Sequence, residues 1–315
     1  MKLNQKTASI MAVLITAAWG SSFILMKNVA ADVAALAFLT LRFGCSALIL
    51  ALIFWKQLKK FNKKTILQSF VLGALLGGYM IFQVIGLRDT SASNSAFITS
   101  LSVLMVPFLA AFMLRKAPSK SNWIGVGLAI LGLVFITGIY QGVTALTFGD
   151  FLTFLCAICV AVHIIVADRY LKESDSLLLG IGQIFAAAII SFVAWLITEP
   201  MTFATVHYTN DLIWAILLTS VFCTCFAFTA QIVVQKHLHP SRLSVIFTLE
   251  PVFAYIYAVL LPLPADVAEP IHWAKVLGCL LVVGGMIISE SGAVERLSKK
   301  AGLLQAEEEK KISQI

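Results

Sequence analysis

Long apolar runs constrain the fold of this chain more than any other feature of its sequence. Ten runs of roughly 19–24 residues contain at most a rare charge, and about 20 apolar residues in a helix cross the ~30 Å hydrocarbon core of a bilayer. The sequence therefore predicts an all-α integral membrane protein with ten transmembrane helices. The predicted spans are residues 8–26, 33–55, 65–87, 91–114, 121–140, 150–168, 177–197, 211–233, 242–263 and 271–289.

Composition supports this prediction and excludes soluble classes of protein. Of the 315 residues, 60% are hydrophobic and 12% are charged, whereas a soluble domain has about 45–50% apolar and about 25% charged residues. The 6 cysteines and the aperiodic glycines exclude a disulfide scaffold and a fibrous protein. The net charge of +7 does not indicate a nucleic-acid partner, because the basic residues form no stripe with interleaved aromatic side chains.

The distribution of Lys and Arg predicts that both termini lie in the cytoplasm. With the N-terminus placed inside, 19 of the 23 basic residues fall in cytoplasmic segments. Lys27, Arg88 and Lys275 fall outside, and Arg42 lies within a span. This asymmetry is the positive-inside pattern of multi-pass membrane proteins.

The two halves of the sequence repeat each other. Pro107 and Pro251 lie 144 residues apart in similar apolar segments, and the spacing Gly125-x6-Gly132 recurs as Gly278-x6-Gly285. Each half holds five spans, so the second half must enter the bilayer from the opposite face. Such inverted repeats are typical of alternating-access transporters, whose substrate site lies near the bilayer midplane. We expect a first repeat over residues 1–145, a second over residues 146–291, and a charged cytoplasmic tail over residues 292–315.

Several segments resemble a known family in their order and duplication. Span 1 carries Trp19-Gly20-Ser21-Ser22-Phe23, span 2 carries Leu41-Arg42-Phe43, and Thr90–Ile98 runs on to Pro107. Leu249-Glu250-Pro251-Val252 precedes the second glycine pair. Over nearly the whole chain these features resemble the ten-helix EamA-like branch of the drug/metabolite transporter superfamily. One departure is Arg115-Lys116, where that family often has an acidic–basic pair.

The resemblance implies that each repeat is an EamA-like five-helix unit and that the protein is a carrier of the bacterial inner membrane. It also implies export of amino acids or related metabolites, which is common in this family. It does not name the substrate, because the superfamily includes importers and exchangers of unrelated solutes.

Two ionisable residues lie deep inside predicted spans. Glu250 is about 13 Å from the start of its span, counted at ~1.5 Å per residue, and Arg42 is as deep in span 2. A charge there costs about 2.5–3.5 kcal/mol, so each side chain is expected to face the interior with a partner or a function. Glu250 could carry a proton or brace the helix beside Pro251. Arg42 could pair with Glu250, bind a substrate carboxylate, or snorkel or pair structurally.

Pro107 and Pro251 predict helix kinks at equivalent points of the two repeats, because each lacks a backbone N–H. A kinked helix suits a gate or the wall of a site, and a static kink that improves packing is the alternative.

Other aromatic and polar side chains are candidates for the substrate and proton pathway. Such a mixture is typical of a small-molecule pocket, although core packing or a helix–helix hydrogen bond explains each of them equally well. They are Trp19, Ser22, Tyr79, Gln83, Asn94, His163, Gln183, Tyr255 and Tyr257.

We expect no metal, cofactor or catalytic site. Cys156-x2-Cys159-x3-His163 places three soft ligands on one helical face, but the other cysteines are scattered over other spans. No phosphate-binding loop or hydrolase motif occurs in the sequence, so neither an enzyme nor an ATPase subunit is implied.

The sequence thus predicts a secondary active transporter that exports a small metabolite by alternating access, coupled to protons. Its predicted partners are the substrate, the lipid bilayer and protons. An uncoupled facilitator or exchanger is the first alternative. A membrane scaffold is the second, and it would not need an inverted repeat with an acidic and a basic residue at mid-membrane depth.

Overall fold

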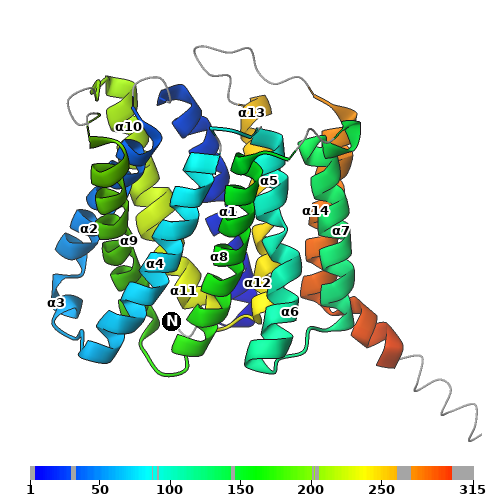
Figure 1. Ribbon diagram of the computed structural model, residues 1–315. Coiled ribbons are helices and arrows are strands. Elements are labelled where there is room, and N and C mark those ends of the chain that lie inside the picture. Colours follow the sequence, from blue (N-terminus) through cyan, green and yellow to red (C-terminus); the bar gives the residue numbers. More distant parts are fainter. Residues whose placement is uncertain are drawn as a thin grey trace, which may run out of the picture.

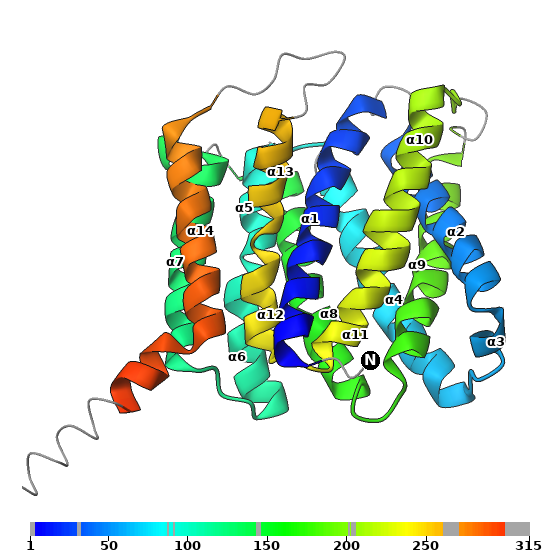
Figure 2. The same ribbon diagram turned by 180° about the vertical axis from the view of Figure 1, so that it is seen from behind.

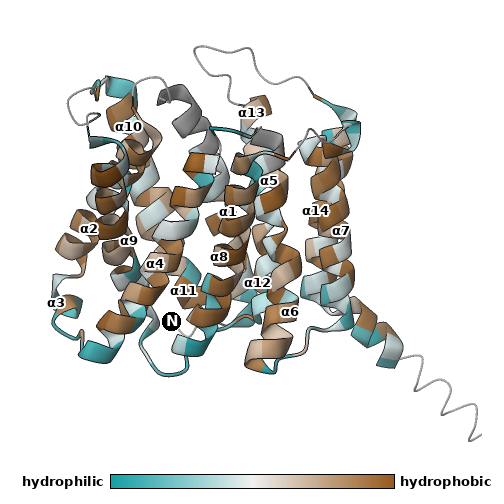
Figure 3. Cartoon of the chain, in the orientation of Figure 1, coloured by the Kyte–Doolittle hydropathy of each residue, from teal (hydrophilic) through white to brown (hydrophobic). Residues whose placement is uncertain are grey.

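The computed structural model describes residues 4–29, 33–86, 88–90, 92–142, 146–200, 202, 206–260 and 271–299, and every regular element within these ranges is a helix. Long helices stand side by side and form a bundle (Figures 1 and 2). Hydrophobic residues dominate the middle of the bundle, and hydrophilic residues gather towards its two ends (Figure 3). The predicted all-α membrane fold is confirmed.

The helices follow the predicted spans closely. In the first half they are α1 (Gln5–Val29), α2 (Ala35–Ile53), α3 (Trp55–Leu58), α4 (Lys63–Gly86), α5 (Ala92–Ser100), α6 (Ser102–Leu114) and α7 (Lys120–Thr137). The first half ends with η1 (Ile139–Gln141). In the second half the helices are α8 (Phe148–Tyr170), α9 (Ser176–Thr198), α10 (Asn210–Leu218), η3 (Thr219–Phe226), α11 (Ala227–Gln235), α12 (Pro240–Phe247), α13 (Glu250–Leu260) and α14 (Trp273–Ser291).

Nine segments of the described chain are long and apolar enough to cross a membrane, and they match nine of the predicted spans within a few residues. The remaining predicted span is α1, a helix of 25 residues that runs along the bundle beside the others (Figure 2). The number of ten crossings therefore stays a prediction.

Corresponding helices of the two halves run in opposite directions. α1 begins at the end of the bundle marked N, whereas α8 begins at the opposite end and runs towards it (Figures 1 and 2). The chain leaves α14 at the end where α1 begins, which we call the N-terminal face. This antiparallel arrangement is the geometry of an inverted repeat.

α7 and α14 pack against each other through reciprocal glycines. A Cβ atom on Gly132 would lie 2.6 Å from the carbonyl oxygen of Gly278, and one on Gly278 would lie 2.5 Å from that of Gly132. Gly125 and Gly285 face each other in the same way, at 2.7 Å in both directions. Small residues permit such close contact between helix backbones in membranes. The repeated glycines therefore join the last helices of the two halves.

A helix break precedes each of the two prolines, and the kinks expected at Pro107 and Pro251 stay predictions. α6 continues through Pro107, and the first half is interrupted at Leu101 instead, six residues earlier. In the second half Thr248 and Leu249 separate α12 from α13, directly before Glu250 and Pro251. Pro251 stands in the first turn of α13, where its missing N–H costs nothing. Pro107 lies inside a membrane helix, where neighbouring groups can compensate for the lost hydrogen bond.

The glycine contacts predict a selective loss of stability. Gly278→Ala should lower the apparent melting temperature in detergent, because overpacking costs typically 1–3 kcal/mol. Gly284→Ala is the matched control on the same helix, since nothing lies within 4 Å of its Cβ position. That control should leave stability unchanged or raise it, because alanine favours helix. Equal effects of the two substitutions would contradict the predicted role of the reciprocal contact.

Orientation in the membrane can be tested with impermeant thiol reagents. Cysteine introduced at Tyr208, whose side chain is 63% exposed at the face opposite the N-terminal face, should react from outside intact cells lacking the six native cysteines. Cysteine at Lys60 should react only after permeabilisation, because the positive-inside pattern places it in the cytoplasm. The reverse pattern of labelling would overturn the predicted orientation.

Candidate functional site

A π-helix interrupts the span Asn210–Gln235 in the middle of the bundle. η3 covers Thr219–Phe226 and lies between two regular α-helical segments, α10 and α11. π-helical turns are rare and occur frequently at functional sites. Sequence analysis missed this element. The sequence feature that could have indicated it is a run of small polar residues within an apolar span. Three of these residues, Thr219, Ser220 and Thr224, are fully buried.

Arg42 and Trp19 both donate hydrogen bonds to this π-helix. The Arg42 Nε donates to the Thr224 hydroxyl at 2.7 Å, and its Nη2 donates to the carbonyl oxygen of Cys223 at 3.2 Å. The indole Nε1 of Trp19 donates to the same Cys223 carbonyl at 3.1 Å. Arg42 is only 3% exposed. The predicted intramembrane cation is therefore held inside the bundle, where α1, α2 and η3 meet.

Serine hydroxyls fix the backbone around Arg42. The Ser46 hydroxyl donates to the Arg42 carbonyl at 2.7 Å and lies 3.2 Å from the Ser220 carbonyl, a second acceptor on η3. The Ser220 hydroxyl in turn donates to the Arg42 carbonyl at 2.9 Å. These bonds join α2 to η3 along two turns, so the position of the guanidinium follows from the packing of the two elements.

Glu250 is the first residue of α13, directly after the helix break. Its side chain is half-buried, and among the described residues it has no hydrogen bond or ion pair. It interacts electrostatically with Arg42, Tyr79 and Cys156, which belong to α2, α4 and α8. α1 also packs closely against this point, because a Cβ atom on Gly20 would lie 3.0 Å from the Glu250 carbonyl oxygen. The unpaired carboxylate is thus surrounded by helices of both repeats.

His163 and Gln183 form a buried pair. The His163 Nε2 lies 2.9 Å from the Gln183 Oε1, and the Gln183 amide donates to the Phe228 carbonyl at 3.0 Å. Because the glutamine oxygen must then accept, the assigned network requires a proton on His163 Nε2. Tyr79 contacts the imidazole edge-on, with ring centroids 6.1 Å apart. Phe228 packs on Trp19 at 5.1 Å, which connects this pair to the Arg42 region.

The remaining candidates lie apart from this group or make local contacts. The Ser22 hydroxyl donates to the Trp19 carbonyl of its own helix at 2.7 Å. Tyr255 accepts a hydrogen bond from the His272 backbone at 3.0 Å, near the face opposite the N-terminal face. Gln83 is half-buried. The side chain of Asn94 lies outside the described part of the structure.

The central cluster is therefore defined by residues of seven helical segments. Its members carry one acid, one cation, a potential proton carrier and aromatic walls, which are features of a small-molecule site. The cluster comprises Trp19, Arg42, Tyr79, His163, Gln183, Thr224 and Glu250.

Substitution at Thr224 tests the anchoring of Arg42. Thr224→Val keeps the shape of the side chain but removes the acceptor for Nε, so it should destabilise the protein by about 1.5–3 kcal/mol, as for other hydrogen bonds to charged groups. Thr229→Val is the matched control, because the buried Thr229 hydroxyl has no hydrogen-bond partner. Melting curves in detergent should separate the two variants. A smaller effect at Thr224 than at Thr229 would contradict the anchoring role.

Comparison with known proteins identifies the family of the chain. The profile of the EamA-like transporter family matches twice, over residues 6–138 and 147–290. An uncharacterized transporter of Archaeoglobus fulgidus is 31% identical over 278 residues, which is 87% of this chain and 83% of that protein. The uncharacterized transporter YyaM of Bacillus subtilis is 26% identical over 263 residues, 80% of this chain and 83% of the relative.

A solved crystal structure shares the fold, with a TM-score of 0.76 and 17% sequence identity over 93% of this chain and 99% of that one. The twofold match covers both halves of the chain, and each half contributes residues to the central cluster. The chain belongs to the EamA-like transporter family and is a multi-pass membrane transporter of the drug/metabolite type.

Proposed function

We propose that the protein is a secondary active transporter of the bacterial inner membrane, which exports a small metabolite in exchange for protons by alternating access. Its substrates are amino acids or related compounds. Residues 1–145 and 146–291 form the two repeats that move against each other, and residues 292–315 form a cytoplasmic tail. The tail and the N-terminus both face the cytoplasm, as the distribution of basic residues indicates.

The observation that carries this proposal is the unpaired carboxylate of Glu250. Placing an acidic side chain at this depth in the membrane costs free energy, and such residues mark proton or substrate pathways. No carboxylate stands at the equivalent position of the first repeat, where Val106 lies 144 residues earlier. Symmetry of packing alone therefore gives no reason for the acid. Protonation removes most of the cost of enclosing Glu250 in a closed, water-free intermediate.

The pairing of charges in the cluster supports a zwitterionic substrate. Arg42 carries five N–H donors, and its two hydrogen bonds to η3 leave other N–H groups for a substrate carboxylate. Glu250 offers an acceptor for a substrate amino group, which would replace the proton that the carboxyl otherwise carries. Trp19 and Tyr79 supply apolar surface beside these groups.

Ion pairs between the repeats at both ends of the bundle support alternating access. At the N-terminal face Lys116 binds Asp168 at 2.8 Å, and Lys64 binds Glu173 at 2.8 Å. At the opposite face Arg88 binds Glu199, again across the repeats. The Lys64–Glu173 pair is exposed, whereas the carboxylates of Asp168 and Glu199 are largely buried. Opening either end must therefore replace these contacts with other partners or with water.

An uncoupled facilitator or exchanger is the second candidate. It is favoured by the position of Glu250 in the first turn of α13, because the partial positive charge of a helix N-terminus stabilises a carboxylate. If this effect keeps Glu250 ionised throughout the cycle, the residue binds substrate but carries no proton. A membrane scaffold gives no use for either charge.

Proton coupling is tested with reconstituted protein. Proteoliposomes containing a pH-sensitive dye are exposed to single L-amino acids, and a pH change identifies the substrate together with the coupling. One proton per cycle and a gradient of one pH unit should concentrate a neutral substrate by up to about tenfold. Glu250→Gln mimics the protonated acid, so it should lose this accumulation while retaining exchange of labelled substrate.

Asp211→Asn serves as the control, because Asp211 is an exposed acid in the first turn of α10, outside the cluster and outside the ion pairs between the repeats. It should accumulate substrate like the wild type. Wild-type accumulation by a well-expressed Glu250→Gln variant would show that Glu250 does not carry the proton. Substrate exchange without any pH change in the wild type would favour the uncoupled exchanger.

A further inference from the structure

Two grooves lie outside the central cluster, and both face sideways out of the bundle. The first has a volume of about 360 Å³ and is lined by α6 and α8, including Met113, Ile165 and Arg169. We call it the Arg169 groove. The second has a volume of about 340 Å³ and is lined by α1, α10, η3 and α13, including Leu25 and Tyr257. We call it the Leu25 groove.

The two grooves are equivalent under the internal repeat. Met113 and Tyr257 correspond at the offset of 144 that relates the two prolines, and the first helices of the repeats, α1 and α8, line one groove each. The floor of each groove is thus the first helix of one repeat, and a wall comes from the helix that follows the break. Because the repeats are inverted, the Arg169 groove lies towards the N-terminal face and the Leu25 groove towards the opposite face.

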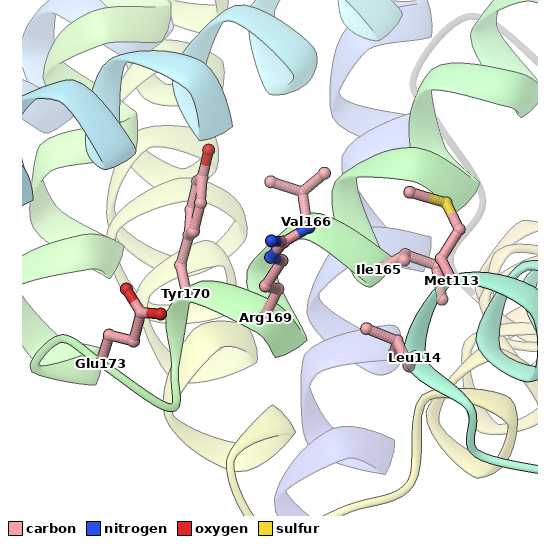
Figure 4. Close-up of a pocket in the computed structure, with 7 residues that line it drawn as sticks. All are labelled: Met113, Leu114, Ile165, Val166, Arg169, Tyr170 and Glu173. Atoms are coloured by element: carbon pink, nitrogen blue, oxygen red, sulfur yellow. The ribbon is translucent and has the colours of Figure 1, made fainter.

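The grooves differ in charge. Arg169 rises from α8 beside Val166 in the lining of the first groove (Figure 4), and the residue is exposed. Glu173 lines the same groove, but its carboxylate is bound by Lys64 at 2.8 Å and only interacts with Arg169 electrostatically. Among the described residues Arg169 has no ion pair, and the described lining of the Leu25 groove includes no charged side chain.

We propose that the Arg169 groove binds an anionic phospholipid of the leaflet at the N-terminal face. Arg169 binds the phosphate group, since a guanidinium matches phosphate geometry with two parallel hydrogen bonds. An acyl chain follows the apolar wall formed by Met113, Ile165 and Val166. Basic pockets between transmembrane helices on the cytoplasmic side are suited to lipid headgroups. The described lining of the Leu25 groove holds no cation, so this groove accepts an acyl chain without selecting the headgroup.

The proposal is tested by native mass spectrometry of the full chain in detergent with an equal mixture of phosphatidylglycerol and chain-matched phosphatidylcholine. The wild type should retain one phosphatidylglycerol with a preference of about fivefold, the value expected for one basic residue near the headgroup. Arg169→Gln should abolish this preference. Lys172→Gln, which removes an exposed cation that does not line the groove, should retain it.

A second variant keeps the proposal testable if Arg169→Gln fails to fold. Met113→Trp leaves every charge in place but fills the groove at a side chain that is 49% exposed, so it should also displace the bound lipid. No preference in the wild type, an undiminished preference in Arg169→Gln or Met113→Trp, or an equal loss in Lys172→Gln would each overturn the proposal. The last outcome would mean that surface charge alone attracts the lipid.

Discussion

The hydrocarbon core contains no water, so each polar backbone group there needs a partner from the protein itself. The centre of this structure depends on how that requirement is met at one carbonyl group. The oxygen of Cys223, within the π-helix, accepts hydrogen bonds from both Trp19 and Arg42. A carbonyl has two lone pairs, and both are used here. The departure from regular helix is thereby compensated by side chains of the other repeat.

This arrangement explains how a buried arginine is tolerated without a carboxylate in contact. Thr224 and the Cys223 carbonyl are neutral acceptors for the hydrogen bonds of Arg42. The charge of Arg42 still interacts electrostatically with Glu250. A permanent Arg–Glu contact would hold both charges in one place, and breaking a buried pair costs several kcal/mol. Separate anchoring leaves the two groups able to respond to a ligand that enters between them.

The sequence was sufficient for the helices and for the residues with unusual charge. Hydropathy located the spans because burial in lipid requires about 20 apolar residues, and Arg42 and Glu250 stood out within them. Hydropathy does not distinguish the hydrogen bonding of an α-helix from that of a π-helix, so it did not predict η3. The interruption at Leu101, six residues before Pro107, was not predicted from the sequence. The pairing of His163 with Gln183 joins residues of two helices and needed the tertiary structure.

The reciprocal glycines have a mechanical consequence. Gly125 and Gly132 are seven residues apart, so the two contact points with Gly285 and Gly278 lie about 10 Å apart along the helices. Two fixed points define a line. Sliding of α7 along α14 would drive backbone atoms into carbonyl oxygens, whereas rotation about the line keeps both contacts intact. The last helices of the two repeats can thus serve as a rotation axis. The remaining helices of each half can rotate about this axis while α7 and α14 stay in contact.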